Sequence, residues 1–277
     1  MKARLLVMAT ILFASMFYSC SKDDSPDNAT PPEDLTAQEL TAARIQSDLV
    51  FDDVSSEVLQ VTLNGTTGAA STTSAACATV TISPQDLTTW PKTITIDYGS
   101  TGCTGINGWV RKGKISYTLT KLPRETGAVV NVSFDNFFVN GYKLEGSYSI
   151  TNNGSTDANL NITTRLVNGK ITYPDGKWYT RTSTINWQQV AGSATASVLD
   201  DEFNVTGEAV IKSSANNELI TSSKTPLLRK VTCGNFVSGQ LNVAYNGIAG
   251  VLDFGGGTCD KKATLSLGAR NYEVTLP

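Results

Sequence analysis

The residues that could do chemistry in this chain are five cysteines and a set of carboxylates, because the sequence contains no histidine. Without histidine the chain can form neither a Ser-His-Asp nor a Cys-His catalytic group, nor a histidine-ligated zinc site. Carboxylate chemistry and oxygen-ligated calcium remain possible. The 22 Lys and Arg residues against 25 Asp and Glu give a net charge of −3, so the chain lacks the basic excess typical of nucleic-acid binding.

Four of the cysteines form two pairs with the same spacing. Cys77 and Cys103 are 26 residues apart, and so are Cys233 and Cys259. A hairpin turning midway between the second pair, at Asn246, would bring its cysteines within bridging distance, and a longer turn would do the same for the first pair. Three pairings of four cysteines are formally possible. The spacing predicts the disulfides Cys77–Cys103 and Cys233–Cys259.

The two cysteine pairs also share neighbouring residues. Asp97 precedes Cys103 and Asp253 precedes Cys259, and each Asp is followed by an aromatic residue and a glycine. This weak internal repeat indicates equivalent ends of one sheet or a duplicated element. Each Asp could bind calcium together with backbone carbonyls, with Asp260 as a further ligand in the second copy. Alternatively, each could accept hydrogen bonds from N–H groups of its turn.

Tryptophans are the other candidate ligand-binding residues. Trp109, Trp178 and Trp187 could offer a surface on which sugars stack, or they could pack in the core of a sheet. Neighbours along a strand, such as Trp178 and Tyr179, point to opposite faces, so one of the two could be exposed. Paired carboxylates could hydrolyse glycosides, but nothing in the sequence marks two of them as a pair. We therefore expect no catalytic residue, no enzyme activity and no cofactor.

Antiparallel strands must position these residues. Over residues 77–277 apolar side chains alternate with polar ones, and Thr, Val, Ile and Tyr are frequent, which is typical of half-buried strands with a wet outer face. Sequences favoured in hairpin turns recur between these stretches. They are Asn140-Gly141, Asn152-Asn153-Gly154, Asn168-Gly169, Pro174-Asp175-Gly176 and Asn246-Gly247. The pattern predicts an all-β domain: an antiparallel meander of about 12–15 strands forming a strongly curved sheet, a sandwich or a barrel.

One helix is expected before the sheet, over residues 35–63. Thr36 and Glu39 have the spacing of a capping box at its start. Asp52-Asp53 could divide the helix into two pieces. Apolar residues form a single stripe along it: Ile45, Leu49, Val54, Val58 and Val61. We expect this helix to pack on the sheet or to plug a barrel end, with binding of a partner as the alternative.

The N-terminus has the pattern of an export signal. Basic residues precede an apolar run of roughly 14 residues, which suits a secretory signal better than a membrane span of about 20 residues. Cys20 follows this run, and the arrangement resembles a bacterial lipoprotein signal. The resemblance implies that residues 1–19 are removed and that Cys20 is lipidated, which would attach the protein to a membrane.

The residues after Cys20 indicate where in the cell envelope the protein is located. Ser21-Lys22-Asp23-Asp24 resembles the acidic export tag of Bacteroidetes lipoproteins that are displayed on the cell surface. This implies a lipid-anchored protein of the bacterial outer membrane that is exposed on the cell surface. Residues 20–34, rich in Pro, Ser and Asp, would form a flexible tether.

Several segments are similar to an uncharacterised family of Bacteroidetes cell-envelope lipoproteins. They are residues 91–99, 103–105, 111–115, 134–141, 168–176 and 253–259. The similarity extends over most of residues 35–277. Members of this family have no assigned activity, so the resemblance implies architecture and location and carries over no catalytic residue.

These observations lead us to expect a non-catalytic cell-envelope protein that is structural or binds an extracellular glycan or protein, and not nucleic acid. A carbohydrate-binding accessory of a glycan uptake system is the first alternative, and it predicts a contiguous exposed strip of Trp and Tyr. A barrel-type carrier of a small apolar ligand is the second, and it predicts a lined cavity.

Overall fold

The computed structural model describes residues 32–66, 77–86, 88–105, 108–156, 159–195 and 199–276. The expected export signal, Cys20 and most of the expected tether lie outside these residues. One helix, fourteen strands and the short 3-10 turn η1 (Val231–Cys233) make up the described chain. Their bounds are α1 Pro32–Thr66, β1 Thr79–Ser83, β2 Lys92–Asp97, β3 Cys103–Thr104, β4 Val110–Leu119, β5 Val129–Val139, β6 Tyr142–Thr156, β7 Asn159–Thr172, β8 Trp178–Ala191, β9 Glu202–Ser213, β10 Glu218–Lys230, β11 Phe236–Tyr245, β12 Ile248–Gly256, β13 Lys262–Leu267 and β14 Arg270–Thr275.

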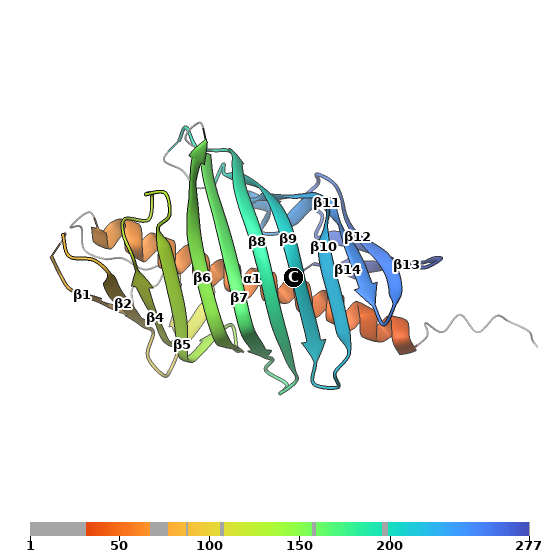
Figure 1. Cartoon of the computed structure of the whole chain (residues 1–277). Coiled ribbons are helices and arrows are strands. Elements are labelled where there is room, and N and C mark those ends of the chain that lie inside the picture. The colour runs from red at the N-terminus through yellow and green to blue at the C-terminus, as the bar shows by residue number, and fades with distance from the viewer. Residues whose placement is uncertain are drawn as a thin grey trace, which may run out of the picture. The chain divides into compact units, whose positions relative to one another are not determined.

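All fourteen strands belong to one antiparallel sheet. Each strand pairs with the next along the chain, apart from the two-residue β3, which pairs with β4 as β2 does. β1 and β14 form the two ends of the strand order (Figure 1). The expected meander is therefore confirmed. Of the three forms that the sequence allowed, the strongly curved sheet is the one found, since the sheet curls without closing into a barrel.

Strand pairing stays in register across the whole sheet. One row of paired residues runs from Ser83 through every strand of the meander to Asn271, and all its members but Val251 are polar. The adjacent row begins at Ile82 and includes the buried Tyr117 and Tyr148. Because side chains alternate between the faces of a strand, this register gathers the apolar residues on the concave face.

Two of the five expected hairpin turns are bulges instead. Asn168 and Gly169 lie inside β7, where the register shifts between Leu166 and Gly169, and the turn expected at Asn153 lies inside β6. Asn168 has a positive φ of 52°, a conformation that suits a bulge as well as a turn. The opposite strand bulges at Gly146, where a Cβ would lie 2.8 Å from the carbonyl oxygen of Asn168. Such bulges lengthen the strands and increase the curl of the sheet.

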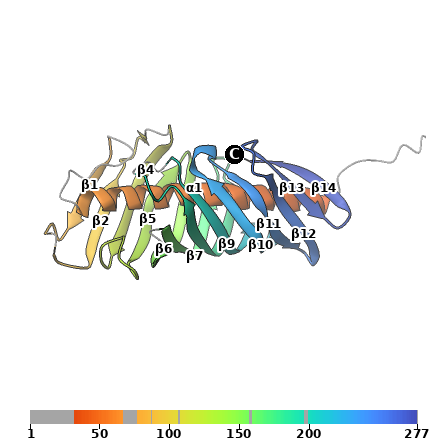
Figure 2. The same ribbon diagram turned by 90° about the horizontal axis from the view of Figure 1, so that it is seen from above.

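Helix α1 occupies the concave face of the sheet (Figures 1 and 2). It is continuous, and a few residues longer at each end than the expected range 35–63. Asp52 and Asp53 do not break it, because each carboxylate pairs with an arginine of the sheet, Arg229 and Arg111 respectively. Although α1 has 35 residues, no helix in the described ranges is both long and apolar enough to cross a membrane.

The two halves of α1 pack in two apolar clusters. Residues 37–45 contact buried side chains of β8 to β14, whereas residues 50–61 contact those of β2 to β7. Ile45 and Val54 of the expected apolar stripe are buried in these clusters, as are Val58 and Val61. The helix thus joins both halves of a sheet whose strands otherwise contact mainly their immediate neighbours.

Candidate functional site

The two cysteine pairs are at disulfide distance, as the spacing predicts. The Cα atoms lie 5.7 Å apart in Cys77–Cys103 and 5.3 Å apart in Cys233–Cys259. The second pair brackets the hairpin of β11 and β12, which turns at Asn246. Each pair therefore crosslinks a hairpin close to one end of the sheet.

The internal repeat in the sequence corresponds to a repeated hydrogen bond in the structure. Asp97 accepts a hydrogen bond from the N–H of Gly99 at 2.9 Å, and Asp253 accepts one from the N–H of Gly255 at 2.8 Å. Lys114, 2.9 Å from Asp97, and the Gly99 N–H together lower the pKa of the Asp97 carboxyl. Both Asp residues therefore accept the hydrogen bonds from turn N–H groups that the sequence offered as the alternative to calcium binding.

Asp260, the third calcium candidate, has local partners as well. Its carboxylate accepts hydrogen bonds from the Thr258 hydroxyl at 2.8 Å and from the Lys262 N–H at 3.1 Å. Throughout the described part of the chain, no group of three or more His, Cys, Asp and Glu side chains is placed to hold a metal ion.

The structure does not bring the three candidate tryptophans together. Trp187 lies between Phe203 and Phe236, with ring centroids 6.2 and 6.4 Å away, and packs against both apolar clusters. Trp109 packs against the cluster around the C-terminal half of α1. Trp178 is half-buried on the outer face of β8, under the ammonium of Lys170. These three residues form no contiguous aromatic strip.

Buried charges form a polar belt between α1 and the sheet, a feature that no pattern in the sequence predicts. Arg111 donates to Asp53 at 2.9 Å, and its guanidinium lies 3.4 Å from Glu57. Burial disfavours the charged form of Arg111, but the hydrogen bond and charge of Asp53 outweigh it, so the pKa of Arg111 is raised. Glu57 also accepts the hydroxyl of Tyr98 at 2.9 Å.

The second part of the belt lies near the middle of the helix. Asp48 pairs with Arg44 on the helix itself and with Arg181 of β8, 2.5 Å away. Burial lowers the pKa of Arg181 to about 10. Each of the four arginines pairs with at least one of four carboxylates, and these pairs position α1. The carboxylates are Asp48, Asp52, Asp53 and Glu57. Among the described residues, one buried guanidinium nitrogen each of Arg111, Arg181 and Arg229 has no hydrogen-bond partner.

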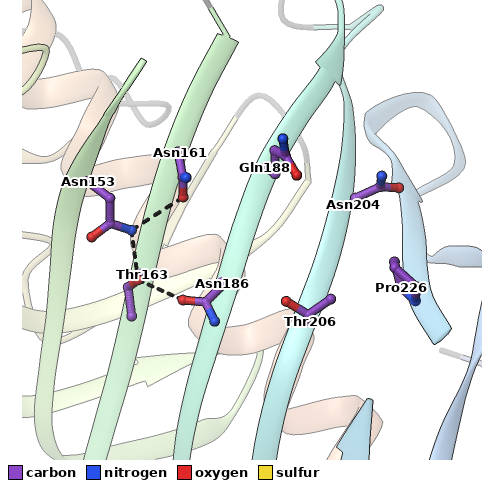
Figure 3. Close-up of a pocket in the computed structure, with 8 residues that line it drawn as sticks. All are labelled: Asn153, Asn161, Thr163, Asn186, Gln188, Asn204, Thr206 and Pro226. Carbon is purple, nitrogen blue, oxygen red and sulfur yellow. Dashed lines mark hydrogen bonds between the residues drawn. The ribbon is translucent and has the colours of Figure 1, made fainter. Parts of the chain in front are cut away.

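A polar hollow of about 400 Å³ lies on the outer face, over β6 to β10 (Figure 3). None of the described residues that line it is ionisable. Seven amide and hydroxyl residues, here called the amide grid, line it together with Pro226. They are Asn153, Asn161, Thr163, Asn186, Gln188, Asn204 and Thr206.

Register places most of the grid in two parallel rows. Asn161, Gln188 and Asn204 are paired across β7, β8 and β9, and Thr163, Asn186 and Thr206 form the next outward-facing row. Neighbouring groups in a row are therefore about 4.8 Å apart. Alternation explains why these polar side chains point outward, since the residues between them, such as Ile162 and Val205, are buried.

Hydrogen bonds order one side of the grid. The side-chain amide of Asn153 donates to Asn161 at 3.3 Å and to Thr163 at 2.8 Å, and the Thr163 hydroxyl donates to Asn186 at 2.7 Å (Figure 3). Sequence reasoning missed this site, although a signal exists: Asn is depleted in strands, yet it recurs at outward positions of β6 to β9.

The grid offers many neutral donors and acceptors on an exposed surface. Amides and hydroxyls can both donate and accept, which matches the chemistry of sugar hydroxyls. The arrangement can therefore bind a neutral hydroxylated ligand. Comparison of the chain with protein-family models, curated proteins and solved structures finds no match.

Proposed function

We propose that this chain is a non-catalytic, lipid-anchored protein of the bacterial outer membrane that binds an extracellular neutral glycan on the outer face of its sheet. The observation that carries the proposal is the amide grid, a regular array of neutral hydrogen-bonding groups on an exposed face. The lipoprotein-like signal at Cys20 supports the location, and two disulfides are typical of exported proteins.

A carrier of a small apolar ligand is less well supported than a glycan-binding protein. The concave face, where such a ligand would be enclosed, is occupied by α1, which is buried along both apolar clusters. The outer face, in contrast, is open and polar. Binding there depends on hydrogen bonds rather than on a tryptophan platform, so we expect selectivity for the positions of hydroxyl groups more than for stacking surfaces.

A glycan array followed by calorimetry on the neutral polysaccharides that bind would test the proposal. The double variant Asn161→Ala/Asn186→Ala should weaken binding about tenfold or more, because each lost hydrogen bond contributes about 0.5–1.5 kcal/mol. The matched control is Asn131→Ala/Asn242→Ala, which removes two exposed amides from the same face outside the grid. If no neutral glycan binds, or if both double variants weaken binding equally, the grid is not the binding site.

A further inference from the structure

The outer face carries a second feature at the opposite end of the same strands. Register pairs Lys112 of β4 with Phe138 of β5, Phe138 with Lys143 of β6, Lys143 with Thr172 of β7, and Thr172 with Trp178 of β8. This row extends about 19 Å across five strands. With Glu145 and Lys170 of the neighbouring row, it forms what we call the lysine–aromatic patch.

The patch is positively charged in an acidic protein. Lys143 and Lys170 share one carboxylate, that of Glu145, at 3.3 and 4.0 Å. Among the described residues no carboxylate pairs with Lys112, whose ammonium lies over the Phe138 ring. Three lysines and one glutamate leave a local charge of +2, against −3 for the whole chain.

Bordering lysines differ from those of the patch because they are paired one to one. Lys114 lies 2.9 Å from Asp97, and Lys212 lies 2.6 Å from Glu218. These two bordering lysines therefore add nothing to the excess of positive charge in the patch.

The patch combines its cations with aromatic rings. The ammonium of Lys112 lies 4.2 Å from the centroid of Phe138, and that of Lys170 lies 5.0 Å from the centroid of Trp178. Both rings are half-buried, so part of each remains open to solvent. Rings offer apolar area for the face of a sugar, and adjacent ammoniums offer charge-assisted hydrogen bonds to its carboxylate or sulfate.

We propose that the lysine–aromatic patch is a second binding site, for an anionic polysaccharide whose sugars carry carboxylate or sulfate groups. An extended row of spaced cations and rings suits a chain of repeating anionic rings. Nucleic acid fits less well, because the chain lacks the basic excess that many phosphate contacts require. On β6, Lys143 of the patch is ten residues from Asn153 of the amide grid, which is about 30 Å along the strand. The proposed site therefore does not depend on glycan binding at the grid.

Calorimetry with polygalacturonate and with dextran sulfate tests this inference, with methyl-esterified polygalacturonate and plain dextran as uncharged counterparts. We expect the charged polymers to bind, the uncharged ones to bind at least tenfold more weakly, and binding to weaken as salt is added. Lys143→Ala/Lys170→Ala should weaken binding about tenfold or more, since hydrogen bonds to charged groups are among the stronger ones. Trp178→Ala should also weaken it.

Matched variants make the result decisive. Lys212→Ala/Lys262→Ala changes the net charge equally but removes lysines paired elsewhere, and it should leave affinity within about twofold, as expected for exposed ion pairs. Asn161→Ala/Asn186→Ala should also leave it unchanged, which separates this site from the grid. Equal losses in both lysine variants, no binding of either charged polymer, or equally tight binding of single-stranded DNA or anionic lipid vesicles would overturn the proposal.

Discussion

At the scale of single residues, the carboxylates on α1 have different roles that depend on how exposed their side chains are. Asp53 is buried against Arg111, whereas the side chain of Glu39, near the start of the helix, is 47% exposed. Glu39 accepts the Tyr179 hydroxyl at 2.6 Å and the Lys177 ammonium at 3.1 Å. The hydrogen bond from Tyr179, followed by that from Lys177, lowers the pKa of Glu39 below its ordinary value of 4.5.

This lowered pKa predicts a dependence of stability on pH. The ionised Glu39 stabilises the fold above about pH 4.5, and that contribution is lost as the pH falls through the lower folded-state pKa. In Tyr179→Phe the pKa of Glu39 should rise toward 4.5, and the free energy of unfolding should change less steeply with pH below that value. NMR titration of the Glu39 carboxyl and urea unfolding at pH 3–6 measure both effects. Tyr148→Phe, which removes a hydrogen bond to Ser55 instead, should leave the pKa of Glu39 unchanged.

At the scale of elements, the polar belt determines how α1 is placed along the sheet. Apolar contacts alone would tolerate sliding or rotation of the helix, but Asp48, Asp52 and Asp53 each meet an arginine on a different strand. Buried ion pairs are poor sources of net stability, yet breaking one leaves an uncompensated charge. The belt therefore acts by specifying a single docking position.

Asp48→Ala should destabilise the protein by about 3–5 kcal/mol, because Arg44 and Arg181 would both remain buried without their carboxylate. Chemical denaturation with intact disulfides measures the change. Glu273→Ala breaks the exposed pair with Lys262 and should cost less than about 1 kcal/mol. Similar small losses in both variants would mean that the belt is hydrated and does not fix the helix.

Sequence patterns predict the elements here better than they predict the site. Alternation and β-branched residues indicate the meander, and equal spacing indicates the cysteine pairs, because both are local or simply periodic features. Asn168-Gly169 is ambiguous, since a positive φ serves a bulge as well as a turn. The amide grid depends on which residues of β6 to β9 stand side by side, and bulges such as that at Gly169 shift this register by amounts that no local pattern specifies.

At the scale of the whole molecule, the sheet presents one long polar face whose two ends differ in charge. The amide grid is neutral and the lysine–aromatic patch is cationic, and both are carried by β6, β7 and β8. The lipid anchor that we propose at Cys20 would hold this face near the membrane. A polymer that spans both regions would gain affinity, because binding at one site raises its effective concentration at the other.

The anchor itself is testable in the bacterial host that the signal implies. Wild-type protein should incorporate labelled palmitate and sediment with the outer membrane, whereas Cys20→Ser should do neither, because no other residue of the signal offers a thiol for acylation. Protease added to intact cells should degrade the wild-type protein if it faces outward, with a periplasmic protein as the control for cell integrity. Labelling that persists in Cys20→Ser would contradict the anchor, and protection from protease would place the polar face toward the periplasm, where extracellular polymers do not reach it.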